Sequence, residues 1–211
     1  MEIERDPEME RRLIDALTRD YGEREGVHIS ELNFCIRRAF IRRTHNIKVP
    51  DEKVLQYARG RFLHRLFWVP GKEELFKREG IFGTPDGYFE ENGELIPLEI
   101  KTTVWNVKSI KDKDFWIDQL KSYCYMAGSL MGYLGVFQIV GYGKDRSPKL
   151  YAWRVRFTKE ELKEHWAKLK TRRDVLLESL EKNQPPPKLY GGHEWECENC
   201  ECKEVCDALG D

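Results

Sequence analysis

The sequence lacks several features that would place it in a common functional class. Its 211 residues contain no apolar run of the roughly 20 residues that a membrane helix requires. Residues 1–6 contain no apolar core of a signal peptide. No Gly-x-Gly-x-x-Gly or phosphate-binding loop follows an expected strand, so nothing supports nucleotide-dependent chemistry. We therefore expect a cytoplasmic protein with no membrane partner.

The chain also lacks an excess of either charge. It has 36 basic and 37 acidic residues, which give a formal net charge of −1. This balance provides no global positive field for a nucleic acid, although local basic patches beside acidic metal ligands would give the same total. Hydrophobic residues make up 40% of the chain, which excludes global disorder and allows one core with a small appendage.

Apolar periodicity predicts both helices and strands. Helices are expected over 7–20, from Ser30 through Phe40, over 51–68, over 114–130 and, after a capping box at Thr158, over 159–181. Strands are expected over 80–89, 94–103, 136–141 and 150–157, and the turn at Asn92 and Gly93 makes the first two a hairpin. This order predicts an α/β fold with a mixed central sheet flanked by helices.

The expected hairpin carries charged residues with a clear chemistry. Glu99 and Lys101 are two positions apart and therefore share a strand face, and Asp86 lies on the neighbouring strand. Their apolar neighbours predict burial, and a buried charge needs a partner or a function. Carboxylates suit Mg²⁺ or Mn²⁺, which acidifies a bound water, and a lysine can orient that water. The alternative is an exposed surface hairpin with a Glu-x-Lys pair.

Four motifs in sequence order resemble those of the restriction-endonuclease-like nucleases, in their RecB-like branch. The resemblance covers a P-D-x(n)-E-x-K signature with twelve intervening residues, an upstream Gly-x-x-x-His and a Gln-x-x-x-Tyr helix motif, and it extends from about Ser30 to Cys206. The matching residues are Gly60 and His64, Pro85 and Asp86, Glu99 to Lys101, and Gln119 and Tyr123.

The resemblance implies a metal-dependent DNA exonuclease of the RecB type that uses Mn²⁺ or Mg²⁺. It implies that Lys101 positions water and stabilises charge, and that Gln119 and Tyr123 orient substrate or support the site. The implied metal ligands are His64, Asp86 and Glu99, and the implied catalytic residues are Asp86, Glu99, Lys101, Gln119 and Tyr123.

The chain has six cysteines, and four of them lie in the last fifteen residues. In a reducing compartment this favours a metal or a cluster over disulfides. Cys35, Cys197, Cys200 and Cys206 would provide four thiolates, for zinc or for an iron–sulfur cluster. Their spacing resembles that of the CRISPR-associated Cas-four nucleases and helicase-linked nucleases. We therefore favour an iron–sulfur cluster, [4Fe–4S] before [2Fe–2S], and leave Cys202 as a spare thiol or an alternative ligand.

The resemblance to the Cas-four family implies cleavage of single-stranded DNA ends during CRISPR spacer acquisition, together with the Cas-one/Cas-two integrase. Two alternatives stay open: a repair or viral nuclease of the same superfamily, and a non-catalytic adaptor that binds DNA ends. The expected division is a nuclease core over 1–184 and an iron–sulfur segment over 185–211, to which Cys35 contributes. Homo-oligomer formation is left open.

Two groups of arginines are candidates for a DNA path, because such groups neutralise phosphates without reading sequence. Solvated helix faces are the alternative, which we prefer for the basic residues between 168 and 173. The candidate groups are Arg37, Arg38, Arg42 and Arg43 near Cys35, and Arg59, Arg61 and Arg65 near His64.

Overall fold

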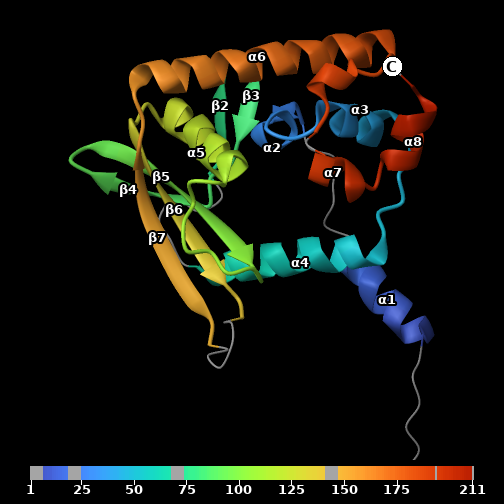
Figure 1. The fold of residues 1–211 in the computed structure, drawn as a ribbon, viewed down its shortest axis with the longest axis horizontal. Helices are drawn as coiled ribbons and strands as arrows, with labels where there is room; N and C mark the ends of the chain where they lie inside the picture. Colours follow the sequence, from blue (N-terminus) through green and yellow to red (C-terminus); the bar gives the residue numbers. More distant parts are fainter. Residues whose placement is uncertain (1–6, 19–24, 68–73, 141–146, 193, 211) are drawn as a thin grey trace, which may run out of the picture.

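The computed structural model describes residues 7–18, 25–67, 74–140, 147–192 and 194–210. These residues form two sheets with helices around them (Figure 1). The larger sheet has the order β4-β5-β6-β7, in which β5 and β6 are parallel and the other two pairs are antiparallel. Its strands are β4 (Gly87–Glu91), β5 (Glu94–Thr103), β6 (Met131–Gln138) and β7 (Lys149–Arg156). The predicted mixed α/β class is confirmed.

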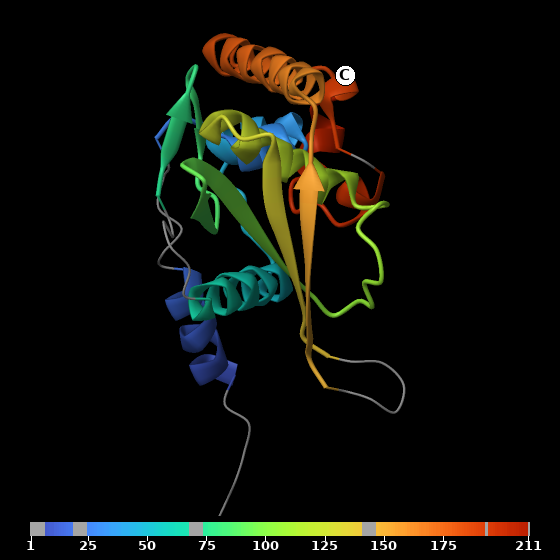
Figure 2. The ribbon, with the colours of Figure 1, turned by 90° about the vertical axis from the view of Figure 1, so that its left-hand side faces the viewer.

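A second, smaller sheet replaces part of the single central sheet that the sequence predicts. Its order is β1 (Val27–His28), β3 (Ile81–Gly83) and β2 (Phe76–Arg78), with β1 parallel and β2 antiparallel to β3. Figure 2 shows it standing apart from the larger sheet. The predicted continuous strand over 80–89 is wrong, because β3 and β4 belong to different sheets. Pro85 lies between them, and proline has no N–H to continue a ladder.

The helices over the larger sheet follow the sequence prediction closely. Helix α5 (Asp114–Ala127) packs against β5 and β6, and α6 (Lys159–Lys182) packs across α5, α3 and α2. Thr158 caps α6 with the predicted capping box to Glu161. Strand β6 begins at Met131 and not at 136, because Gly132 and Gly135 weaken the local strand signal.

The predicted helix beginning at Ser30 is in fact two helices. Helix α2 (Ile29–Leu32) ends before a short break, and α3 (Ile36–Thr44) begins after it. The sulfur of Cys35 caps α3 by accepting the Arg38 backbone N–H at 3.4 Å. Helix α4 (Asp51–Leu66) packs against β5 and against α1 (Pro7–Thr18), and Trp68, where a longer α4 was predicted to end, lies outside the described residues.

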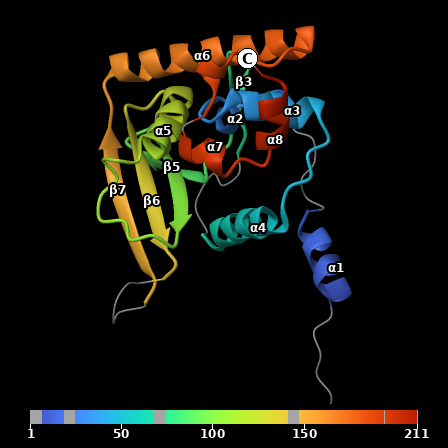
Figure 3. The same cartoon turned by 45° about the vertical axis from the view of Figure 1, so that its right-hand side comes forward.

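Three short helices follow α6: η1 (Lys188–Tyr190), α7 (Glu194–Glu198) and α8 (Lys203–Ala208). Of these, η1 and α8 pack against α3, and Figure 3 shows α8 beside it. One hydrophobic cluster joins this segment to α2, α3 and α6; its fully buried members include Leu32, Ile36, Phe40, Trp166, Leu176 and Cys202. A second cluster lies between α5 and β6. None of the described helices combines the length and apolar character needed to cross a membrane.

Candidate functional site

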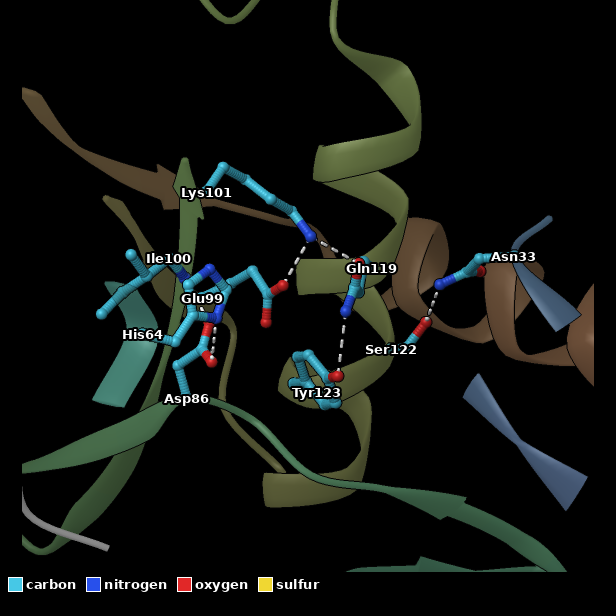
Figure 4. Close-up of polar contacts among 9 residues, drawn as sticks. All are labelled: Asn33, His64, Asp86, Glu99, Ile100, Lys101, Gln119, Ser122 and Tyr123. Carbon is cyan, nitrogen blue, oxygen red and sulfur yellow. Dashed lines mark hydrogen bonds and ion pairs between the residues drawn. The ribbon is translucent and has the colours of Figure 1, made fainter. Parts of the chain in front are cut away.

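Four structural elements bring the predicted catalytic residues together (Figure 4). Part of this site borders a pocket of about 580 Å³, which is lined by His64, Asp86, Gln119 and Tyr123 but not by Glu99 or Lys101. The residues come from the last turn of α4 (His64), the segment before β4 (Asp86), strand β5 (Glu99 and Lys101) and helix α5 (Gln119 and Tyr123). Residues that are 59 positions apart in the sequence, from His64 to Tyr123, therefore lie in one site.

Asp86 is fixed by two hydrogen bonds. Its Oδ2 accepts the backbone N–H of Ile100 at 2.7 Å, and its Oδ1 lies 2.9 Å from His64 Nδ1. The register of β4 and β5 pairs Gly87 with Leu98, which brings the residue before β4 alongside the middle of β5. The interruption between β3 and β4 at Pro85 thus places this carboxylate just before β4, at the edge of the larger sheet, rather than within a strand.

Lys101 links strand β5 to helix α5. Its Nζ donates to Glu99 Oε1 at 2.6 Å and to Gln119 Oε1 at 2.7 Å. Gln119 Nε2 then donates to the hydroxyl of Tyr123 at 3.1 Å, because residues four apart share a helix face. The side chains form one connected row that crosses from the sheet to the helix.

Glu99 is the most deeply buried charged group of this row, at 3% exposure. Burial, which the Lys101 ammonium opposes and the nearby charge of Asp86 reinforces, raises the pKa of its carboxyl to about 7. Glu99 therefore gains and loses a proton near neutral pH. A cation placed beside it would favour the ionised form.

The oxygen and nitrogen atoms of this site are of the kind that bind a hard cation, but they are not arranged as a coordination site. Across the described ranges, no group of three or more His, Cys, Asp or Glu side chains is arranged to hold a metal ion. His64 and Asp86 bind each other, and Lys101 binds Glu99. Two carboxylates and an imidazole are nevertheless a donor set suited to Mn²⁺ or Mg²⁺, and buried Glu99 lacks full compensation. A cation would compete with His64 and Lys101 for these oxygens.

Comparison with solved structures supports the architecture. The crystal structure of SSO0001 matches with a TM-score of 0.59 at 17% identity, over 97% of this chain and 98% of that one. The two chains share a fold. A phage-related exonuclease from Haemophilus somnus 129PT matches over 82% of each chain at 14% identity, but its TM-score of 0.36 is too low to indicate a common fold. No protein-family model matches the sequence, and no curated protein matches it significantly.

The cysteine segment brings the four predicted thiols near one another. Cys35 caps α3, Cys197 lies in α7 and Cys206 in α8 (Figure 3). All six cysteines are free thiols. Burial raises the pKa of Cys197, and negative charge on Cys35, Cys200 and Cys206 raises it further, which shows that these thiols interact. Thiols are suitable ligands for zinc or for an iron–sulfur cluster. Their present arrangement in the described residues is not one that could hold a metal ion.

Cys202 differs from the other three tail cysteines. It is 1% exposed and belongs to the main hydrophobic cluster. Its thiol hydrogen bond to Cys200 lowers the pKa of Cys200 to about 6 and raises its own. Its backbone N–H also donates to the Cys200 sulfur at 3.4 Å. These contacts make Cys202 a neighbour that stabilises the Cys200 thiolate.

The predicted DNA path along α3 is wrong for Arg37, which is buried. Arg37 is 1% exposed, and its guanidinium donates to the carbonyls of Pro186 at 2.6 Å and Gly210 at 2.7 Å. Arg43 binds the Glu31 carboxylate and the Gly26 carbonyl. The reason is tertiary: these arginines hold neighbouring segments of the protein.

Arg172, which we expected on a solvated face, likewise donates to the carbonyls of Leu32 and Phe34. By contrast, Arg61 and Arg65 line the pocket beside His64, as expected for the second arginine group, whereas Arg59 is not part of the lining.

The sequence also missed two aromatic residues of the pocket, His28 and Phe82. They lie on strands of two and three residues, which are too short for a periodicity to reveal.

Proposed function

We propose that this chain is a metal-dependent deoxyribonuclease that acts on the ends of single-stranded DNA. The observation that carries the proposal is the connected row of Glu99, Lys101 and Gln119 beside the pair of Asp86 and His64. It supplies the buried carboxylate of Glu99, the half-buried carboxylate of Asp86, a fixed ammonium group and an imidazole in one connected site beside the pocket. These are the groups that phosphodiester hydrolysis needs.

In this proposal His64, Asp86 and Glu99 hold Mn²⁺ or Mg²⁺, which supplies an acidified water and neutralises charge on the attacked phosphate. Lys101 has three N–H donors, of which two go to Glu99 and Gln119. The third can reach the attacking water or a phosphate oxygen. Gln119 acts as a positioning residue that fixes the ammonium group. The hydroxyl of Tyr123 accepts from Gln119 and can donate its own proton to substrate.

We further propose that Cys35, Cys197, Cys200 and Cys206 hold an iron–sulfur cluster of the [4Fe–4S] type. The mutual effect of these thiols on the pKa of Cys197 supports this ligand set. The cluster would connect α3 to the end of the chain, because Cys35 and Cys206 come from those two parts. Thiolate ligation couples binding to folding, so its role is structural.

A place in CRISPR spacer acquisition, next to the Cas-one/Cas-two integrase, is proposed on the resemblance of the motifs alone. Co-purification of the chain with the integrase encoded in the same genome tests it. Failure of the two to associate, with cleavage intact, would favour a repair or viral nuclease.

The cleavage experiment uses the full chain with end-labelled single strands, duplexes and RNA, in Mn²⁺ and in EDTA. We expect cleavage of single-stranded DNA only with the metal. Lys101→Met should lower the rate by about 10²–10³-fold, the usual effect of removing one transition-state donor. Lys113→Met is the matched control, because Lys113 pairs with Asp112 outside the site. Tight binding without cleavage by the unmodified chain would favour the adaptor instead.

A further inference from the structure

The smaller sheet presents a row of three side chains on one face. Lys77 lies directly opposite Phe82 in the pairing of β2 with β3, and His28 lies opposite Phe82 in the pairing of β1 with β3. Side chains at directly opposed positions point to the same face of a sheet. His28 and Phe82 line the same pocket as His64 and Asp86. The row therefore continues the candidate site on the side away from the larger sheet.

The two rings are held in place by the protein itself. They stack with centroids 5.6 Å apart at an interplanar angle of 29°, and Lys77 Nζ lies 4.8 Å from the Phe82 centroid. The edge of Phe82 rests on Gly26, where a Cβ would lie 2.2 Å from the ring and where φ is +79°. Gly26 therefore permits the ring position. Neither ring is buried, so a fixed aromatic surface is present before any ligand arrives.

Helix α4 contributes positive charge to the pocket. Arg61 and Arg65 lie four residues apart on α4 and both line the pocket, with His64 beside them; Glu25 and Asp86 are its acidic lining residues. A nucleotide has one flat apolar part and one anionic part, and this pocket combines aromatic rings from the smaller sheet with guanidinium groups from α4. A paired duplex keeps its bases inside the helix, so only an unpaired nucleotide can present its base to these rings.

We propose that His28 and Phe82 form a base-stacking subsite for an unpaired nucleotide next to the cleaved phosphate, and that Lys77 binds the adjoining backbone. The inference rests on the proposed function, because it names the substrate contact of that same site. Stacking on an aromatic ring tolerates every base. The subsite therefore selects for an unpaired strand and not for a sequence.

The test measures binding of a 5′-labelled oligothymidylate to the full chain by fluorescence anisotropy in EDTA, where no cleavage occurs. Phe82→Leu should weaken binding by about 5- to 100-fold, the range found for the loss of one stacked base. Phe62→Leu is the matched control, since Phe62 is exposed on α4 and outside the pocket lining, and it should leave binding unchanged.

A scan with single abasic residues makes the test specific to the ring. One position should weaken binding to the unmodified chain, and at that position Phe82→Leu should cause no further loss, which is the coupling expected of two groups in contact. Equal losses at every position, or no binding of single strands at all, would overturn the subsite.

A second variant covers the case in which Phe82→Leu fails to fold, as judged by its thermal melt. Lys77→Gln should keep the abasic penalty and should reduce the slope of log K against log salt by about 0.7, the contribution of one phosphate contact. An unchanged slope would overturn the role of Lys77.

Hydrolysis of a small phosphodiester that has no base separates the two proposals. With Mn²⁺, Phe82→Leu should lower this rate far less than it weakens oligothymidylate binding, because the substrate has no base. A loss of rate as large as the loss of binding would place Phe82 in the chemistry and overturn a pure stacking role. If the unmodified chain cleaves no phosphodiester while the abasic coupling holds, the proposed function fails and the subsite stands.

Discussion

The candidate site around Glu99, beside the pocket, and the cysteine segment are both polar regions, but the protein holds them in different ways. In the pocket, each charged group has a polar or oppositely charged neighbour: Lys101 binds Glu99 and Gln119, and His64 binds Asp86. In the cysteine segment, like groups lie together, and each thiolate makes it harder to ionise Cys197.

This difference determines what each region needs in order to form. The protein itself largely compensates the charges of the pocket, so the pocket can form without a metal ion. The thiolates of the cysteine segment repel one another, and the protein compensates them in part: the Cys202 thiol stabilises Cys200, and Arg37 Nε donates to the Cys206 sulfur at 3.4 Å. A bound cationic group would supply the rest of the compensating charge. We expect the first region to be preorganised and the second to fold with its cofactor.

The largest expected effect is the loss of the proposed cluster, and it tests whether the cysteine segment needs a cofactor to fold. If the proposed cluster is present, the purified protein should be brown and contain iron and sulfide. Cys35→Ser should then remove the colour and loosen the end of the chain, because the cluster would link α3 to residues 185–211. Iron and sulfide analysis, visible absorbance and hydrogen exchange of the C-terminal segment measure this. The same result is expected for the serine variants of Cys197, Cys200 and Cys206.

Cys202→Ser is the matched control and should keep the colour, because Cys202 packs in the hydrophobic cluster. If Cys202→Ser loses the colour and Cys206→Ser keeps it, the ligand set is wrong. A colourless, folded protein with stoichiometric zinc would exclude the cluster.

The two regions also differ in how far the sequence predicts them. The spacing of Glu99 and Lys101, and that of Gln119 and Tyr123, follows from local strand and helix geometry, so the sequence was enough to place each pair on one face. Arg37 shows the limit of this reasoning. Its carbonyl partners are 149 and 173 residues away, and only the tertiary fold brings them to it.

The fold itself was predictable where elements are long and was missed where they are short. The capping box of α6 and the hairpin of β4 and β5 follow from local signals. Strands of two or three residues, such as β1 and β2, have no measurable period. The position of Asp86 between two sheets depends on how the sheets pack together. The Pro-Asp motif alone gives no information about that packing.

The next largest effect is a pH dependence of stability, which tests how fully the protein compensates the charge of Glu99. In the metal-free protein the pKa of Glu99 is raised from 4.5 to about 7. The protonated form therefore stabilises the fold below pH 4.5, and this contribution is lost as pH rises through 7. The loss amounts to roughly 3 kcal/mol of unfolding free energy, at 1.36 kcal/mol per pKa unit. Urea melts in EDTA across this pH range measure it.

Glu99→Gln is the isosteric comparison and should flatten this part of the profile. Mn²⁺ should reverse its slope in the unmodified chain, because only the ionised carboxylate binds the cation. An identical profile for both proteins in EDTA would show that Glu99 is ionised throughout, fully compensated by Lys101.

The smallest effects separate the two groups of arginines. Arg37→Gln leaves the Pro186 and Gly210 carbonyls without their charged donor, so it should lower the unfolding free energy by about 1–3 kcal/mol. Arg61→Gln should instead lower stability less than Arg37→Gln and reduce the salt slope of DNA binding by about 0.7, as for one phosphate contact. Urea melts and salt titrations of both variants test these two expectations. If Arg37→Gln changed the salt slope and Arg61→Gln lowered the stability, DNA would bind along α3 instead.

Helix α6 sets a constraint on how this protein can change in evolution. It has 24 residues, and at 1.5 Å per residue it is about 36 Å long. It packs on α5 near the pocket and on α3 near the cysteines (Figure 1). One inserted residue would turn everything beyond it by about 100°, so Leu162 and Leu176 could not both face the interior. Relatives of this chain should therefore vary in the lengths of their loops and conserve the length of α6.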